Sequence, residues 1–345
     1  MATSRRFIIY GAGAMGGVAG AELFTHGNEV LLIARGEHYR VIAESGLRYI
    51  TPGGETTLPI PAVDDPAKID FRPDDVVIVA VKSQDTYSVM ESLYRVAPQS
   101  IAVACLQNGV ANEDVVSRFF PNVYAISVSS PAEFLVPGSV VSFASPVCGA
   151  LRLGRYPHGT DAAAQEIGAA LDATRYDAKV FPDVQRWKWA KLLDNLVNVV
   201  QALLDPAAGS AISAIGRGQG TGAVLGKRAR EEAIRAYEAA GIDYVGLEEF
   251  KKGGSAVIAR EVHGAERVGA SMHQSLTRGL SSLETDYING EIVRLGHLHG
   301  VPTPVNAFYQ RISHEAVANR IQPGSISETE FLSRLADFEK AYPAN

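Results

Sequence analysis

The chain has 345 residues, of which 46% are hydrophobic and 20% are charged. This length is large for a single hydrophobic core and favours two domains, and the composition excludes a disordered protein. The formal net charge of −6 gives no sign of the basic surface that nucleic-acid-binding proteins carry. We therefore expect a globular protein of two domains that does not bind nucleic acid.

Targeting segments and stabilising cross-links are not expected. The first residues lack the apolar run of a signal peptide, and no stretch of about 18 uncharged apolar residues predicts a membrane span. Cys105 and Cys148 lie in apolar segments and indicate two reduced, structural thiols. His263 and His273 have no second ligand at metal-binding spacing, so no metal site is predicted. These features favour a cytoplasmic protein.

The first half of the sequence alternates short apolar runs with helical stretches. This alternation is typical of a parallel sheet whose strands are joined by crossover helices. A helix over 15–25 follows the first strand, and Gly27 is placed to end it. The predicted strands are 7–10, 30–34, 76–81, 101–106 and 124–128, with two more peripheral strands at 140–144 and 150–153.

After about Pro182 the pattern changes from strands to helices. We predict a domain boundary near Phe181, which divides the chain into domains 1–181 and 182–345. The segment 206–222 is rich in Gly, Ser and Ala and is expected to be a loop or a weak helix. The predicted helices are 184–204, 223–240, 255–268, 281–299 and 305–319. The sequence thus predicts an α/β domain, then an all-helical domain, and a ligand site in the cleft between them.

Gly11, Gly13 and Gly16 form the spacing GxGxxG directly after the first predicted strand. In this setting the first glycine makes a tight turn, the second lets the backbone approach a pyrophosphate, and the third lets helix and strand pack closely. The helix that begins at Ala14 and Met15 offers N–H groups and the positive end of its dipole to the phosphates. The segment predicts a dinucleotide-binding Rossmann domain.

The end of the second predicted strand bears on the choice of cofactor. NAD-selective sites usually place an acidic residue there to accept a hydrogen bond from the ribose 2′-hydroxyl. This chain instead has Arg35, whose guanidinium could pair with a 2′-phosphate. The arginine predicts NADP(H), although a solvated surface arginine is the alternative explanation.

Further segments, together with the glycine loop, resemble the ketopantoate reductase (2-dehydropantoate 2-reductase) family. The segments are 11–16, 80–83, 107–109, 189–195 and 284–290, and they span nearly the whole chain. The resemblance implies a Rossmann domain followed by an all-α domain like the C-terminal domain of 6-phosphogluconate dehydrogenase. It also implies reduction of a 2-keto acid by NADPH, with ketopantoate as the default substrate and a place in pantothenate biosynthesis.

The resemblance assigns roles to four residues. Lys191 is implied to be the general acid, and Glu284 to hold the substrate hydroxyl and position the lysine. Asn108 is implied to lie near the nicotinamide and the reacting centre, and Lys82 on the cofactor side. Alternatives stay open for two of them, because Asn108-Gly109 is a common turn pair and Glu284 could be a favourable charge at a helix N-terminus.

The residues around Lys191 support the assignment independently. Ketone reduction needs a proton for the developing alkoxide, and a lysine in a partly desolvated cleft can supply it. A helix advances about 100° per residue, so Asn195 lies about 40° from Lys191 around the axis and Asn198 about 20° away on the other side. Three polar groups then share one face of an otherwise apolar helix. The alternative is that this face is exposed to solvent.

Two departures from the family pattern concern the part of the site that binds substrate. A second asparagine is expected eight residues after Lys191, where this chain has Val199, so Asn198 could substitute. A serine is expected twelve residues before Glu284, where this chain has Met272, so Ser271 could substitute if one residue is inserted. The keto acid could therefore differ from ketopantoate.

Two other functions compete with this hypothesis. The first is a 2-hydroxy acid dehydrogenase that acts on a branched or aromatic substrate. The second is a non-catalytic NADP(H)-binding redox sensor, which the presence of both Lys191 and Glu284 argues against, because a sensor needs no proton donor. The sequence leaves open the physiological direction and whether the chain forms a homodimer.

Overall fold

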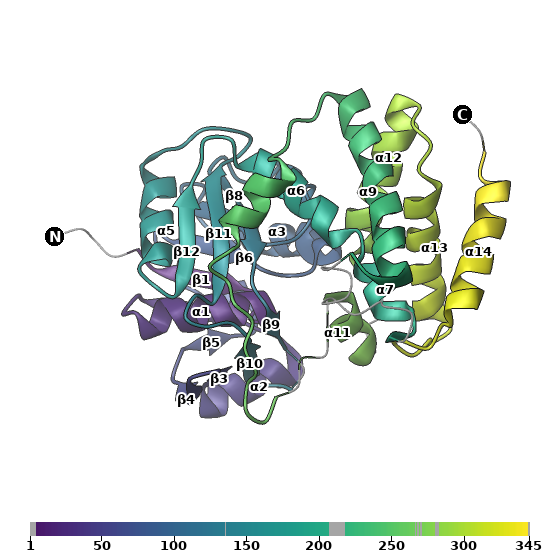
Figure 1. Ribbon diagram of the computed structural model, residues 1–345. Coiled ribbons are helices and arrows are strands. Elements are labelled where there is room, and N and C mark those ends of the chain that lie inside the picture. The colour runs from purple at the N-terminus through teal and green to yellow at the C-terminus, as the bar shows by residue number, and fades with distance from the viewer. Residues whose placement is uncertain are drawn as a thin grey trace. The chain divides into compact units, whose positions relative to one another are not determined.

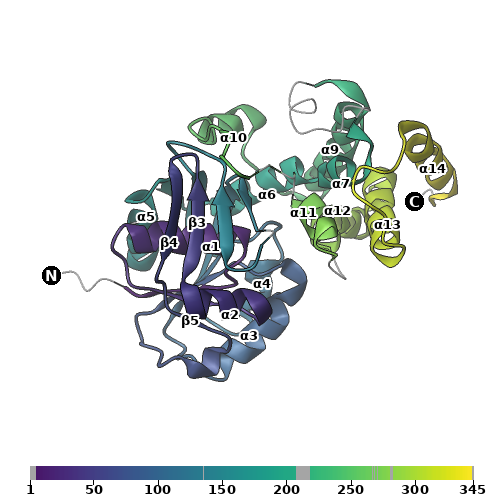
Figure 2. The ribbon, with the colours of Figure 1, turned by 90° about the horizontal axis from the view of Figure 1, so that it is seen from below.

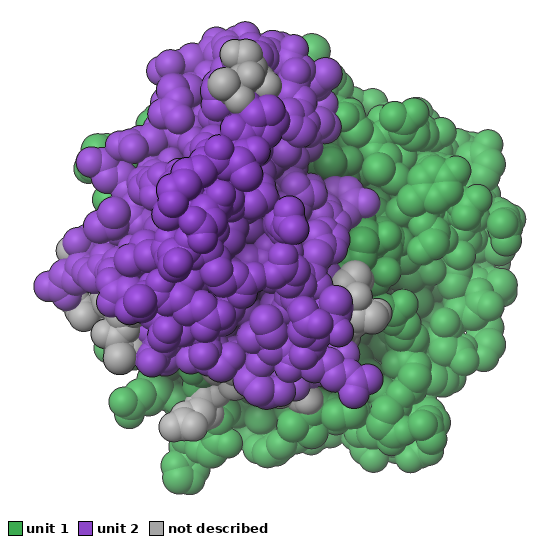
Figure 3. Space-filling view, turned by 90° about the vertical axis from the view of Figure 1, so that its right-hand side faces the viewer, with its two compact units in different colours: residues 1–191, 244–267 green, residues 192–243, 268–345 purple. Residues whose placement is uncertain are grey.

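The computed structural model describes residues 5–134, 136–206, 218–265, 267, 269, 271–279 and 283–343. The chain divides into two compact units (Figure 3): Met1–Lys191 with Tyr244–Arg267, and Leu192–Asp243 with Val268–Asn345. The first unit thus continues past residue 181 to Lys191, and the predicted domain boundary stays a prediction. No helix of the described residues is long and apolar enough to cross a membrane.

An eight-stranded sheet forms the centre of the first unit (Figure 1), in the order β12-β11-β8-β7-β6-β1-β2-β5. All neighbours are parallel except β8 and β11. The strands are β1 (Phe7–Tyr10), β2 (Val30–Ile33), β5 (Ala62–Val63), β6 (Val76–Val79), β7 (Ala102–Cys105), β8 (Val123–Ser129), β11 (Gly149–Arg155) and β12 (Tyr176–Val180). The predicted Rossmann-type α/β domain is confirmed.

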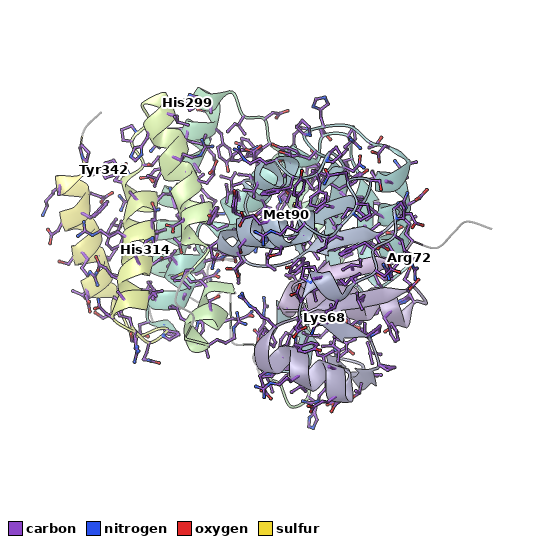
Figure 4. All side chains as sticks on the ribbon, turned by 180° about the vertical axis from the view of Figure 1, so that it is seen from behind. Lys68, Arg72, Met90, His299, His314 and Tyr342 are labelled. Carbon is purple, nitrogen blue, oxygen red and sulfur yellow. The ribbon has the colours of Figure 1, made fainter. Side chains whose placement is uncertain are left out.

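The central strands are apolar on both faces because each face is covered. Ile8 and Val77 point to one face and pack with Met90, which is labelled in Figure 4 and belongs to α3 (Thr86–Tyr94). The helix α4 (Asn112–Ser117) contributes to the same layer. Phe7 and Ile9 point to the other face, where α1 (Ala14–Thr25) and α5 (Ala162–Asp172) bury their apolar sides. Continuous apolar runs in the sequence follow from this double burial.

A second, four-stranded sheet in the same unit was not predicted. Its order is β4-β3-β10-β9, with strands β3 (Leu47–Thr51), β4 (Gly54–Leu58), β9 (Ala132–Glu133) and β10 (Ser139–Ser142). The neighbours β3 and β4 lie side by side in Figure 2. The strand predicted at 140–144 therefore belongs to this sheet. It packs on α1, where a Cβ atom on Gly17 would meet Val140 at 2.6 Å. The helix α2 (Gly36–Ser45) precedes β3, and the short 3₁₀ turns are η1 (Pro66–Lys68) and η2 (Ser83–Asp85).

The described part of the second unit is mostly helical, as predicted. Its helices are α7 (Asn198–Leu203), α9 (Gly220–Ala240), α11 (Ser271–Thr277), α12 (Thr285–His299), α13 (Pro304–Ala318) and α14 (Glu328–Ala341). The helix α12 packs against α9 and α13, and Phe308 and Phe331 meet edge to face at 5.4 Å between α13 and α14. The helices predicted at 223–240 and 305–319 are confirmed, and α9 begins three residues earlier.

One continuous helix over 184–204 is a wrong prediction. The chain forms α6 (Val184–Asn195), a turn at Leu196 and Val197, and then α7. The carbonyl of Leu196 accepts a hydrogen bond of 3.1 Å from the Asn289 side chain. A buried side-chain donor thus satisfies a carbonyl that helical backbone would otherwise satisfy, which permits the break. An interaction with a residue so distant in sequence cannot be inferred from periodicity.

The helix predicted at 255–268 is also wrong. The short helix α10 (Leu247–Gly253) ends before it, and residues 255–265 are not helical. Backbone hydrogen bonds from Ser145 to Ile258 and from Arg260 to Phe143 lay the segment along the end of β10 instead. Of the two remaining segments, 207–217 lies outside the described residues, and the helix predicted to begin at 281 begins at Thr285.

The segment Tyr244–Arg267 is held in the first unit by a buried arginine. Arg152 on β11 donates hydrogen bonds to the carbonyl of Gly253 and, at 2.8 Å, to Asp177. Its guanidinium also lies 5.4 Å from the centre of the Trp187 ring, and a Cβ atom on Gly253 would meet that ring at 2.8 Å. The returning segment therefore completes the packing around the start of α6.

Candidate functional site

The loop between β1 and α1 has the geometry of a dinucleotide-binding loop. Gly11 has φ +103°, a conformation that favours glycine, and a Cβ atom on Gly16 would lie 2.1 Å from the Gly11 carbonyl oxygen. Gly13 is the N-cap of α1, and no side chain caps the first turn. The first N–H groups of α1, at Ala14 and Met15, therefore lie where a phosphate could bind. These contacts fit the pyrophosphate of a nicotinamide cofactor.

Arg35 lies directly after β2, at the N-cap position of α2. Its side chain is 87% exposed, and its guanidinium lies 3.1 Å from a carboxylate oxygen of Asp85, which is 31% exposed. An ion pair this exposed stabilises the fold by about 0–1 kcal/mol, so the guanidinium is available for a stronger anion. Burial raises the pKa of the neighbouring Tyr10 hydroxyl, while Arg35 acts to lower it. The position fits binding of a 2′-phosphate.

The loops after β6 and β7 carry Lys82 and Asn108 and are joined by buried hydrogen bonds. The Gln107 side chain donates to the Val81 carbonyl and to the Thr86 hydroxyl, both at 2.9 Å. The Asn112 side chain donates to the Asn108 carbonyl at 3.0 Å. Asn108 thus has its main chain held while its side chain is partly exposed. Both residues lie at carboxyl ends of parallel strands, where open α/β sheets bind ligands.

A buried ion pair that the sequence analysis missed connects α6 to the Asn108 loop. Lys188 donates hydrogen bonds to the Glu113 carboxylate and, at 3.1 Å, to the Gln107 carbonyl. The two charged side chains are only 2% and 0% exposed. Lys188 precedes Lys191 by one turn of α6, so this ion pair fixes the helix that carries Lys191 relative to the loop that carries Asn108. The sequence does not identify this pair, because Glu113 is distant in sequence and α6 carries several other polar residues.

Lys191 and Asn195 lie one turn apart on α6, so the predicted 40° between them holds. Lys191 is partly exposed, and Asn195 is 5% exposed. The amide nitrogen of Asn195 is buried and has no hydrogen-bond partner among the described residues. A buried donor without a partner is costly, so this amide nitrogen is a candidate for contact with a ligand. Asn198 begins α7 after the turn, so the angle predicted for it from one continuous helix is wrong.

Asn289 positions the turn between α6 and α7 through a buried network that the sequence analysis also missed. Its side chain donates to the Leu196 carbonyl at 3.1 Å and to Asn306 at 3.0 Å. Asn306 donates to Glu232 at 2.8 Å, and that carboxylate also accepts from the backbone N–H groups of Val305 and Asn306. Burial raises the pKa of Glu232 above its ordinary value. The network fixes the turn between Asn195 and Asn198 against α12.

Glu284 is the residue that precedes α12. It is partly exposed, and its side chain makes no capping hydrogen bond to that helix. The alternative explanation for this acid is a charge favoured by the helix dipole, which needs no such hydrogen bond and stays open. The helix that follows Glu284 is fixed by the hydrogen bond from the Asn289 side chain to the Leu196 carbonyl.

Met272 and Val199, which stand where the family pattern has a serine and an asparagine, are buried in helices of the second unit. Met272 is 6% exposed in α11, and its sulfur lies 4.0 Å from the Ser313 hydroxyl. Val199 is buried in α7. Ser271 is the first residue of α11, and its side chain lies outside the described residues. Burial lowers the pKa of His273. No cluster suited to a metal ion is found among the described side chains.

Comparison with known proteins identifies one family for both units. The family model of ketopantoate reductase PanE/ApbA matches residues 7–157, and the model of its C-terminal domain matches residues 183–316. A 2-dehydropantoate 2-reductase of Halobacterium salinarum is 29% identical over 308 residues, which cover 87% of this chain and 95% of that protein. One from Pyrococcus abyssi is 25% identical over 302 residues, which cover 87% of this chain and 94% of that protein.

Solved structures agree with the sequence relatives. A PanE/ApbA family ketopantoate reductase from Ralstonia eutropha is 27% identical, with a TM-score of 0.72, and the match covers 91% of this chain and 99% of that one. A D-mandelate dehydrogenase bound to NADH and anilino(oxo)acetate is 26% identical, with a TM-score of 0.75 and the same coverage. Both proteins match nearly the full chain.

Proposed function

This chain belongs to the ketopantoate reductase family, and we propose that it uses NADPH to reduce a small 2-keto acid to the 2-hydroxy acid, with ketopantoate as the default substrate. The observation that supports this best is on α6, where Lys191 lies one turn from Asn195, whose buried amide nitrogen has no partner among the described residues. The glycine loop and Arg35 are placed to hold NADPH.

The chemistry divides between the cofactor and the chain. When bound, NADPH supplies the hydride that adds to the keto carbon. Lys191 gives a proton to the oxygen on that carbon as negative charge develops there. Asn195 and Asn198 hydrogen-bond the substrate, and Glu284 holds its hydroxyl and orients the lysine. Asn108 and Lys82 hold the nicotinamide side, and Ser271 binds the substrate carboxylate.

A 2-hydroxy acid dehydrogenase acting on a bulkier acid is the second candidate. Met272 and Val199 are buried apolar residues at positions where the family pattern has a serine and an asparagine. Loss of two polar groups favours a less polar substrate, and one structural relative is a D-mandelate dehydrogenase. Because the structure of that relative contains NADH, the test must include both NADPH and NADH. A cytoplasmic location and a homodimer stay predictions.

The test compares substrates and one pair of lysine variants. Ketopantoate, 3-methyl-2-oxobutanoate and benzoylformate are each supplied with NADPH or NADH, and cofactor oxidation is followed at 340 nm. We expect Lys191→Ala to lower kcat by about 10²–10⁴-fold while the affinity for NADPH changes little. Lys227→Ala is the matched control, because that lysine is 76% exposed. Full turnover by Lys191→Ala on the best substrate would exclude Lys191 as the proton donor.

A further inference from the structure

His38 lies next to the glycine loop but is not part of it. It belongs to α2, is 8% exposed, and its ring lies 4.3 Å from the ring of Phe134. Its Nε2 atom is 2.7 Å from the carbonyl oxygen of Ala12, and its Nδ1 atom is 2.8 Å from the backbone nitrogen of Gly138. The imidazole therefore bridges the loop between β1 and α1 and the turn that precedes β10.

These two contacts define the protonation of the ring. The backbone N–H of Gly138 can only donate a hydrogen bond, so Nδ1 must be the acceptor. The Ala12 carbonyl can only accept, so Nε2 must carry the hydrogen. The site selects the neutral ring with its proton on Nε2.

The hydrogen bond to Ala12 also orients the next N–H group. The Ala12 carbonyl and the Gly13 N–H belong to one planar trans peptide, in which the two groups point in opposite directions. A carbonyl held by His38 therefore directs the Gly13 N–H away from His38. Gly13 is the N-cap of α1 and has no side chain to restrain its backbone, so an external hydrogen bond is an effective restraint.

From this geometry we propose that His38 is a positioning residue for the cofactor, because it directs the Gly13 N–H toward the pyrophosphate. This inference rests on the proposed function, since it assumes that the glycine loop binds NADPH. It makes the pyrophosphate end of the cofactor depend on α2, whose first residues follow Arg35. One short helix then contributes to both the 2′-phosphate contact and the pyrophosphate contact.

The experiment measures dissociation constants of NADPH, NADH and adenosine 2′-monophosphate, which has no pyrophosphate. We expect His38→Leu to weaken both dinucleotides equally, by about tenfold, and to leave adenosine 2′-monophosphate unchanged. His38→Gln can both donate to Ala12 and accept from Gly138, so we expect it to bind within about threefold of the wild type. KM for NADPH rises in His38→Leu, while kcat at saturation stays within about twofold.

Arg40→Ala is the control on α2, because that side chain is 66% exposed and forms an ion pair with Glu37 in the same helix. Unchanged dinucleotide affinity in His38→Leu overturns the inference, and so does an equal loss for adenosine 2′-monophosphate, which would indicate general damage to the domain. If His38→Leu does not fold, the folded His38→Gln variant decides the question. Loss of binding to both dinucleotides in His38→Gln then overturns the inference. A wild-type protein that binds neither dinucleotide refutes the proposed function instead.

Discussion

The buried ion pair between Lys188 and Glu113 gives the sharpest stability prediction. Both side chains are almost fully buried, and the second carboxylate oxygen of Glu113 has no partner among the described residues. Lys188→Met removes the cation and leaves the carboxylate uncompensated in the interior. Breaking a buried pair in this way typically costs about 3–5 kcal/mol. We expect that loss in the free energy of unfolding of the first unit.

The assay is urea unfolding followed by tryptophan fluorescence, because Trp187 and Trp189 are the sequence neighbours of Lys188. The double variant Lys188→Met, Glu113→Leu removes both charges, and we expect it to be more stable than Lys188→Met alone by about 2 kcal/mol or more. Lys179→Met is the control, because its ion pair with Asp172 is exposed and contributes about 0–1 kcal/mol. A loss below about 1 kcal/mol in Lys188→Met, or additive losses in the double variant, would refute the reasoning.

Three further predictions concern single residues. Arg35→Ala should weaken NADPH roughly ten- to a hundredfold and NADH little, measured by titration, and equal wild-type affinities would contradict this. Gly16→Ala should destabilise the first unit by about 1–3 kcal/mol in urea, because its Cβ would lie 2.1 Å from a backbone oxygen; an unchanged midpoint would argue against that contact. Burial raises the pKa of Cys105 and Cys148, so Ellman's reagent should label neither until the protein is unfolded, and labelling of the native protein would show otherwise.

The parts of the fold that the sequence could predict are those that local pattern determines. The strands β1, β2, β6 and β7 are buried on both faces, so their runs are continuously apolar, and Ser127 is the one buried polar residue in β8. The roles of Gly11 and Gly16 could be predicted from their spacing, because they depend on backbone conformation and close backbone packing and not on distant side chains. The second sheet escaped prediction because its strands are short and β4 is largely exposed, so its residues carry little apolar pattern.

The parts of the site that were not predicted depend on contacts between residues that are distant in sequence. The turn after Asn195 depends on Asn289, and the Lys188 position depends on Glu113. His38 resembles any polar residue on an amphipathic helix until Ala12 and Gly138 are placed beside it. Candidate reacting residues such as Lys191 could be proposed from the family resemblance. The residues that position them could not, because their partners are specified only by the folded chain.

The return of residues 244–267 to the first unit bears on how the protein is made. During translation, β12 is synthesised well before Gly253. The guanidinium of Arg152 therefore lacks the Gly253 carbonyl as an acceptor until the intervening helices have been synthesised. At about 5–20 residues per second this interval is on the order of ten seconds, and Trp187 lacks its cover throughout. A gene fragment that stops after Lys191 would encode every strand of the large sheet yet leave that tryptophan exposed. The first unit can therefore complete its packing only after residues 192–243 of the second unit have been synthesised.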